Sequence, residues 1–148
     1  MKGTLNISTA SALIAASAGV TIAKHGNRSI TSNCGSADVL RALGINIDMH
    51  TDKISECINK TGICFMFAPN HHPAMKHVAE ARQILGKKGV KTIFNMLGPL
   101  LNPGNVKKQI IGTPNKEYAK KIASAGKKLG AERIITISGE SGSDEVEL

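Results

Sequence analysis

The sequence predicts an α/β domain with a mostly parallel sheet flanked by helices. Short apolar runs rich in β-branched residues alternate along the chain with longer segments in which apolar residues recur at helical spacing. Such alternation is typical of parallel sheets, in which a helix connects one strand to the next. The composition is even over 148 residues, with 41% apolar residues, and this fits one domain over residues 1–148.

The first two predicted elements are a helix and a buried strand. The helix is expected over residues 9–18, capped by the pair Ser8-Thr9 and ended by Gly19. Two apolar residues are expected on its inward face, Leu13 and Ile14. The run "GVTIA" predicts a short strand that ends at Lys24.

Four further elements follow in the first part of the chain. Ser36 is expected to cap the helix "ADVLRAL", which Gly44 ends. The other three are a helix over residues 51–60, the strand "ICFMFAP" closed by Pro69, and a helix from about Pro73 to Leu85.

The last part of the chain continues the alternation. The run "TIFNMLG" is compatible with either a strand or a helix, whereas "KQIIGTP" and "RIITISG" predict strands. A helix is expected over residues 115–129, with one apolar face formed by Tyr118, Ile122, Ala125 and Leu129.

Charge and composition narrow the classes of partner. The net charge of +8 favours an anionic partner, although part of it can be solvated lysine. Aromatic residues make up only 3% and Trp is absent, so the stacking platforms of single-strand nucleic-acid binders are nearly missing. A phosphorylated small molecule explains the charge equally well. The three cysteines contain no CxxC pair, which indicates neither a disulfide framework nor a zinc site.

The start of the chain has some features of a signal peptide. Lys2 precedes the weakly apolar stretch "ASALIAASAG", and Ala16-Ser17-Ala18 fits the small-x-small cleavage pattern. Four polar residues within this region argue against that interpretation: Asn6, Ser8, Thr9 and Ser11. No run approaches the length of a membrane span, and we expect a cytoplasmic protein.

Three polar segments each follow a predicted strand. They are "KHGNRS", "PNHHP" and "SGESGSDE". Ligands of parallel sheets collect at the carboxyl ends of the strands, so all three segments are expected at one rim.

The first candidate site combines two segments that lead into helices. "GTLNISTAS" could be no more than a helix cap, because capping residues are common. A second loop rich in hydrogen-bond donors favours an anion site over a plain cap. It contains Lys24, Arg28, Ser29, Thr31, Ser32 and Ser36. Helix N-termini, hydroxyl groups and cations together bind anions. We interpret the pair of segments as a cradle for phosphate or diphosphate.

The second candidate is a single cation on an apolar helix stripe. Arg82 shares that stripe with Met75, Val78 and Leu85. Its stem could pack while its head reaches water, or its guanidinium could grip a carboxylate with two hydrogen bonds. Adjacent His71 and His72 would make a poor pair of metal ligands, so we expect them to line a pocket or donate hydrogen bonds.

The third candidate is the adjacent pair Asp144 and Glu145, which follows the last predicted strand. The pair could be a solvated turn. Opposite a diphosphate cradle, its hard oxygen ligands would suit Mg²⁺, which usually shares its shell with substrate phosphates and water.

The segments "NISTAS", "KHGNRS", "GSADVLRALGI", "FAPNHHPAMKHV" and "TIFNMLGPLLNP" closely resemble the anthranilate phosphoribosyltransferases of tryptophan biosynthesis. The resemblance runs from Thr4 to Glu145. It implies the catalytic domain fold shared with nucleoside phosphorylases, and transfer of the phosphoribosyl group of phosphoribosyl diphosphate (PRPP) to the amino group of anthranilate, which gives N-(5-phosphoribosyl)anthranilate and diphosphate. It also implies Mg²⁺ and a homodimer.

The resemblance also assigns residues. The residues implied to bind PRPP are Thr4, Asn6, Ile7, Ser8, Thr9, Lys24, His25, Gly26, Asn27, Arg28, Ser29, Ile30, Thr31, Ser32 and Ser36. Asn27 and Arg82 are implied to hold anthranilate, and Ser8, Asp144 and Glu145 to hold the metal. No residue is assigned as a general base, because cleavage of the anomeric bond depends mainly on positioning and on stabilising the leaving diphosphate.

The chain also departs from the family pattern. The family places a helical domain and a glycine-rich diphosphate loop before the position of Gly3, and more sheet and helix after the acidic pair. We therefore expect residues 1–148 to be a partial phosphoribosyl-transfer domain, without the helical N-terminal domain and inactive alone. Ser141 and Ser143 replace residues of a typical "DGLDE" run.

Two alternatives stay open. One is a nucleic-acid-binding relative on the same scaffold, which would have no need of Arg82 on an apolar face. The other is a pyrimidine nucleoside phosphorylase, whose loop motifs do not resemble "KHGNRS".

Overall fold

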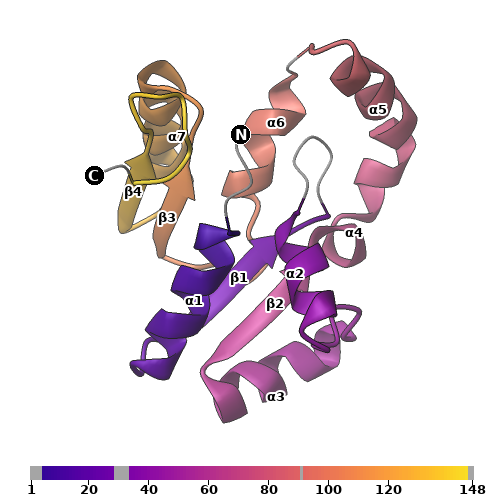
Figure 1. Ribbon diagram of the computed structural model, residues 1–148, viewed down its shortest axis with the longest axis vertical. Helices are drawn as coiled ribbons and strands as arrows, with labels where there is room; N and C mark the ends of the chain where they lie inside the picture. The colour runs from indigo at the N-terminus through magenta and orange to yellow at the C-terminus, as the bar shows by residue number, and fades with distance from the viewer. Residues whose placement is uncertain (1–4, 29–33, 91, 147–148) are drawn as a thin grey trace. The chain divides into compact units, whose positions relative to one another are not determined.

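The computed structural model describes residues 5–28, 34–90 and 92–146. The chain divides into two compact units, residues 1–92 and residues 93–148. In the described residues, each unit contains one two-stranded parallel sheet with helices beside it (Figure 1). The predicted α/β class and the parallel strand direction are therefore confirmed.

The sheet of the first unit pairs β1 (Ile22–Gly26) with β2 (Ile63–Phe67). Their register runs from Ile22 opposite Ile63 to Gly26 opposite Phe67. The strand prediction began three residues too early, at Gly19, and ended two residues too early, at Lys24, because pairing with β2 carries the extended backbone on through Gly26. As a result His25 and Gly26 belong to the strand rather than to the loop that follows it.

Three longer helices accompany this sheet: α1 (Ile7–Ser17), α2 (Ser36–Ala42) and α3 (Thr51–Thr61). Helix α1 lies beside β1, and α3 lies beside β2 (Figure 1). The core cluster consists of Ala37, Leu40, Ile47 and Phe67, with Phe65 packed against it. Helix α2 therefore packs its apolar face near the carboxyl end of β2, and this fixes the position of its N-terminus.

The caps of α1 and α2 differ from the prediction. Asn6, not Ser8 or Thr9, caps α1: its Oδ1 accepts a hydrogen bond from the backbone N–H of Thr9 at 3.0 Å. Gly35 precedes α2, and its N–H donates to Oδ2 of Asp38 at 2.9 Å, so Ser36 is the first helical residue and not the cap.

One core assignment in α1 was also wrong. Ile14, expected to face inward, is 69% exposed. The predicted helix ends were correct, since Gly19 and Gly44 have positive φ angles of 90° and 78° just beyond α1 and α2.

The segment after β2 is less regular than predicted. Strand β2 ends at Phe67, and Pro69 lies in the first turn of a short helix, α4 (Ala68–His71). The helix expected from Pro73 to Leu85 is divided into a 3₁₀ helix, η1 (Pro73–Val78), and α5 (Ala79–Lys87). The tighter 3₁₀ turn begins at Pro73, which has no N–H to donate.

The second unit contains α6, β3, α7 and β4. Their bounds are Ile93–Leu100, Lys108–Gly112, Lys116–Lys128 and Arg133–Ile137. The ambiguous run "TIFNMLG" is thus helical, and both predicted strands are confirmed. Lys108 pairs with Arg133 and Gly112 with Ile137. Ile122 of α7 is buried, but Leu129 lies beyond the helix end and is 67% exposed, so it does not belong to the apolar face.

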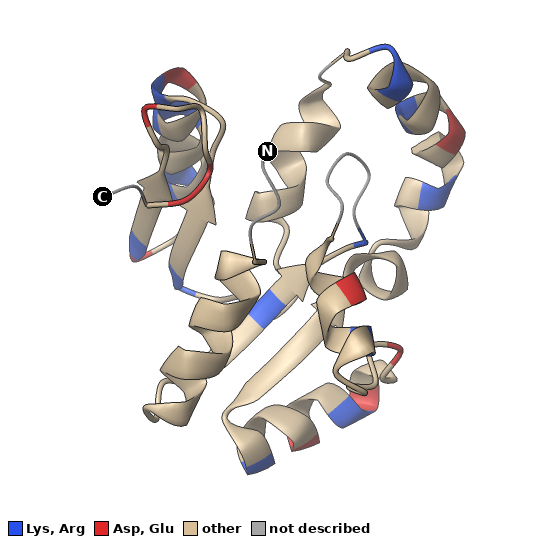
Figure 2. Cartoon of the chain, in the orientation of Figure 1, with Lys and Arg blue, Asp and Glu red and all other residues tan. Residues whose placement is uncertain are grey.

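Charged residues are distributed over several elements within each unit (Figure 2). Acidic residues accompany the basic ones on α3 and α7, where Lys60 pairs with Glu56 and Lys121 with Glu117. In the described part of the chain, no helix is both long and apolar enough to cross a membrane.

Candidate functional site

The carboxyl end of the β1–β2 sheet holds most of the predicted site residues that the structure describes. Parallel pairing places the segment after β1 next to the segment after β2. The described part of "KHGNRS", residues 24–28, therefore shares one rim with "PNHHP", as predicted. "SGESGSDE" belongs to the second unit, so its predicted place at this rim stays a prediction.

Lys24 links the strand to the first turn of α1. Its Nζ donates a hydrogen bond to Oγ of Ser8 at 2.7 Å. Asn6 ties the same turn to the segment before α2, because its Nδ2 donates to the carbonyl oxygen of Cys34 at 3.2 Å. The N-terminus of α1 thus lies beside one ammonium group and is tied to the segment before α2, and a helix N-terminus next to a cation favours an anion.

Thr9 lies in the first turn of α1 and is 1% exposed. Its Oγ1 is buried and has no hydrogen-bond partner within the described part of the chain. Ile7, at the start of the helix, is 41% exposed. The residues that the resemblance assigns to PRPP in this turn therefore differ widely in exposure. Asn6 and Ser8 are the ones whose side chains form hydrogen bonds to other parts of the chain.

Gly26 allows the closest packing at this rim. A Cβ built on it would lie 2.9 Å from Cε2 of Phe65 and 3.3 Å from Cβ of Ser36. Ser36 therefore borders the β1 end without capping α2. A glycine is needed here because any side chain would displace the neighbouring ring or the start of α2.

Asn27 turns the chain away from the sheet. Its carbonyl oxygen accepts a hydrogen bond from the N–H of Ala37 at 3.3 Å, and its Oδ1 accepts one from the N–H of Arg28 at 2.8 Å. The side chain of Asn27 thus supports the backbone of the loop. Its predicted contact with anthranilate stays a prediction.

His25 and Arg28 each contact the segment at the end of β2. Nε2 of His25 lies 3.1 Å from Nε2 of His72. The guanidinium carbon of Arg28 lies 5.5 Å from the centre of the Phe67 ring. Lys24, His25, Asn27 and Arg28 consequently each contact a different residue. Five predicted PRPP residues lie outside the described residues: Thr4, Ser29, Ile30, Thr31 and Ser32.

His71 lies beside this contact and differs from its neighbour. Its Nε2 is buried without a hydrogen-bond partner among the described residues. Burial first, and then the charge of His72, lower the pKa of His71 below its ordinary value. Of the two histidines expected to line a pocket or donate hydrogen bonds, His72 forms a hydrogen bond, in which either ring can be the donor.

Arg82 lies on α5, and the predicted stripe survives the break in the helix. Met75, Val78, Arg82 and Leu85 are all half-buried, whereas most of their neighbours in η1 and α5 are exposed. Arg82 is thus the one charged residue of this stripe. Its direction toward a substrate carboxylate stays a prediction.

The acidic pair lies in an ordered turn of the second unit. Gly139 N–H donates to the carbonyl oxygen of Ser143 at 2.8 Å, and the N–H of Glu145 donates to Oγ of Ser143 at 3.1 Å. Ser143 therefore has a structural role in this turn. A Cβ on Gly112, at the end of β3, would collide with the carbonyl oxygen of Asp144. This contact holds Asp144 at the carboxyl end of the β3–β4 sheet.

The donors of the acidic turn suit Mg²⁺ in chemical type. Asp144 is exposed and Glu145 half-buried, and both offer hard carboxylate oxygens. Within residues 5–28, 34–90 and 92–146 no group of three or more His, Cys, Asp or Glu residues could hold a metal by itself. The pair would need oxygen atoms from a substrate and water to complete a magnesium shell.

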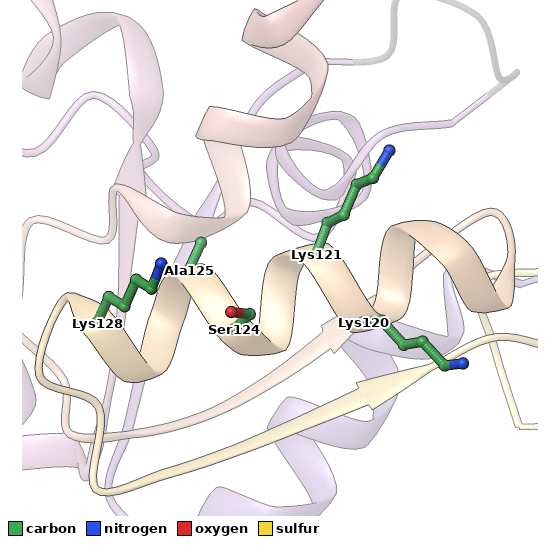
Figure 3. A pocket seen from close by; sticks show the side chains of 5 residues that line it. All are labelled: Lys120, Lys121, Ser124, Ala125 and Lys128. Carbon is green, nitrogen blue, oxygen red and sulfur yellow. The ribbon is translucent and has the colours of Figure 1, made fainter.

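A separate hollow of about 400 Å³ lies along α7. It is lined by Lys120, Lys121, Ser124, Ala125 and Lys128 (Figure 3). Lys120 and Lys121 point to opposite sides of the helix, and Lys121 is paired with Glu117 at 2.6 Å. The charged groups that line the hollow are all cations, and it coincides with none of the predicted site residues.

Comparison with known proteins places the chain in a family. The model of the glycosyl transferase family a/b domain matches residues 1–148. The chain belongs to this family. A relative from Rubrobacter xylanophilus, named anthranilate phosphoribosyltransferase, is 50% identical over 145 residues, which cover 98% of this chain and 42% of that protein. The resemblance noted in the sequence is thereby confirmed.

Solved structures agree with this placement. Anthranilate phosphoribosyltransferase from Thermus thermophilus matches 99% of this chain and 43% of its own, with a TM-score of 0.86 and 42% identity. The Saccharomyces cerevisiae enzyme in complex with PRPP and Mg matches 97% of this chain and 40% of its own, with a TM-score of 0.84 and 36% identity. The chain thus spans about 42% of the length of the curated relatives that it matches.

Sequence reasoning did not identify the residues that pack against the site residues at the strand ends. Phe65 and Phe67 were counted as strand residues, yet they pack against Gly26 and Arg28. Gly112 was counted as part of a strand, and Asp144 of the acidic turn also packs closely against it. The available signal was a glycine at the carboxyl end of each of two strands, β1 and β3, which indicates close approach of another segment.

Proposed function

We propose that the full-length protein carrying this chain is an anthranilate phosphoribosyltransferase. It transfers the phosphoribosyl group of PRPP to the amino group of anthranilate and releases diphosphate. Residues 1–148 form part of its catalytic domain. The observation that carries the proposal is the cluster at the carboxyl end of the β1–β2 sheet, where Lys24, His25, Asn27 and Arg28 each contact a different residue.

The cations of this rim are proposed to bind the diphosphate of PRPP. Lys24 lies beside the first turn of α1, where helix N–H groups add positive potential. Arg28 presents a planar set of N–H donors. Both would stabilise the negative charge that develops on diphosphate as the anomeric bond breaks. The remaining residues of the predicted PRPP set complete the site.

Mg²⁺ is proposed to bind at Asp144 and Glu145, and the assignment of Ser8 to the metal by resemblance stays a prediction. The yeast relative contains both PRPP and Mg, which supports a magnesium-dependent site. When bound, the ion neutralises charge on the diphosphate oxygens.

Anthranilate is proposed to bind against Arg82 and Asn27. Arg82 is the charged member of an otherwise apolar stripe, and it suits a carboxylate attached to an aromatic ring. The amino group of an aromatic amine is already a free nucleophile. The reaction therefore needs the two substrates held in line more than it needs a general base.

Nothing in the described part of the structure favours the alternative of a nucleic-acid-binding relative. The basic residues lie on several elements, Lys53 and Lys60 of α3 both pair with Glu56, and Lys121 of α7 pairs with Glu117. By analogy with the family, we also propose that the full-length protein is a cytoplasmic homodimer.

The test is to purify the full-length protein and to follow the loss of anthranilate fluorescence with PRPP and Mg²⁺. A loss of fluorescence that requires the protein, PRPP and Mg²⁺ together supports the function. Absence of turnover under these conditions, with a folded protein, contradicts it.

A further inference from the structure

Phe67 and His72 are assigned to no substrate. They contact two residues at the carboxyl end of β1, Arg28 and His25. Phe67, the last residue of β2, is 6% exposed and lies under the guanidinium of Arg28. His72 follows α4 and contacts His25, with the two rings in a T-shaped arrangement and their centres 5.0 Å apart. Both contacts start from one short segment, residues 67–72.

The histidine contact restricts the proton positions on both rings. A distance of 3.1 Å between two Nε2 atoms requires one N–H donor and one lone pair. At least one ring is then neutral with its proton on Nδ1. His72 therefore determines the orientation of His25 and restricts which of its nitrogens carries a proton.

The arginine contact uses the face of an aromatic ring. A guanidinium stacked on a ring keeps its N–H donors at its own edge, where they can still bind an anion. Phe67 also belongs to the buried cluster with Ala37, Leu40 and Ile47. The hydrophobic core thus fixes the ring, and the exposed Arg28 lies over its face.

We propose that Phe67 and His72 are positioning residues, which hold Arg28 and His25 in the arrangement that PRPP requires before PRPP binds. This inference rests on the proposed function, because it assigns a role to contacts around the proposed PRPP site. Its own content is that Phe67 and His72, from the end of β2 and the segment after it, position His25 and Arg28 at the end of β1.

Double-mutant cycles in the full-length protein test the inference. Phe67→Leu is expected to raise the dissociation constant for PRPP about threefold to tenfold in the parent and to have little effect in an Arg28→Ala background. Phe67→Tyr keeps the ring and is expected to stay near the parent. If Phe67→Leu does not fold, the histidine cycle below decides alone.

The histidine cycle compares His72→Leu in the parent and in a His25→Ala background. We expect a rise of about fivefold in the PRPP dissociation constant in the parent, partial rescue by His72→Gln, and little effect in the second background. Exposed His77, in η1, supplies the control: His77→Ala is expected to leave PRPP binding unchanged.

A measurement without substrate separates positioning from general destabilisation. Nitrogen NMR of the imidazole rings reports which nitrogen of His25 is protonated. The His25 signal is expected to change in His72→Leu and not in His77→Ala. An unchanged His25 signal in His72→Leu, or additive effects in both cycles, would overturn the inference. If the parent still binds PRPP in that case, the proposed function stands. A parent that does not bind PRPP would overturn both.

Discussion

Gly26 lies so close to Phe65 that a Cβ atom on the glycine would stand 2.9 Å from Cε2 of the ring. Phe65 cannot withdraw freely, because it packs against the buried cluster of the first unit. The shape of the rim therefore depends on the absence of a side chain at one position.

Gly26→Ala should consequently distort the rim. We expect it to destabilise the protein by about 1–3 kcal/mol, as an extra methyl group does in a packed core, and to weaken PRPP binding. Urea unfolding and PRPP titration measure the two effects. Gly86→Ala is the matched control, since nothing lies within 4 Å of its Cβ position on α5, and it should be neutral or slightly stabilising. Equal effects of the two substitutions would show that the close approach is unimportant.

Arg82→Ala should weaken anthranilate binding more than PRPP binding. The expected loss is about 1.5–3 kcal/mol, the range for a hydrogen bond to a charged group. Steady-state kinetics with each substrate varied in turn measure the difference. Lys87→Ala, at an exposed position of the same helix, is the control. An equal loss for both substrates would remove Arg82 from the anthranilate site.

The double substitution Asp144→Asn and Glu145→Gln should raise the Mg²⁺ concentration needed for half-maximal activity. Each change removes the charge from a hard oxygen ligand while it keeps the size of the side chain. Glu140→Gln alters an exposed carboxylate near the same turn and should leave the Mg²⁺ dependence as it was. If the double variant and this control behave alike, the acidic pair is only a solvated turn.

The buried imidazole of His71 predicts a pH dependence of stability. Because its pKa is lowered in the folded protein, the unfolded chain takes up a proton first as the pH falls below about 6.5. The free energy of unfolding should thus decrease as the pH is lowered through this region, and His71→Gln should reduce that decrease. Urea unfolding between about pH 8 and about pH 5 tests this. The same decrease in the variant would assign the effect to other groups, and exposed His77→Gln should behave like the parent.

The elements that the sequence predicted best are those with strong local signals. Gly19 and Gly44 marked two helix ends correctly, and the β-branched runs marked all four strands of the described residues. The errors arose where one residue type has several uses. Asn6 was taken for a substrate residue and is also the cap of α1, whereas Ser36 was taken for a cap and begins α2.

The contacts that support the candidate site could not be predicted from the sequence. Lys24 and Ser8 could be assigned together by resemblance, but their hydrogen bond depends on how β1 and α1 pack. The contacts of Phe67 and His72 join segments about 40 residues or more apart in sequence and follow from the register of β1 with β2. No local pattern in the sequence encodes that register.

Calorimetric titration of PRPP in the presence of Mg²⁺ tests the central claim most directly. The full-length parent should bind PRPP, and Lys24→Met should bind it about tenfold or more weakly, because the ammonium group beside the first turn of α1 is lost. Lys60→Met is the matched control, since Lys60 precedes β2 at the opposite end of the sheet and should leave binding unchanged. A parent that does not bind PRPP, or a Lys24→Met variant that binds it as tightly as the parent, would contradict the account.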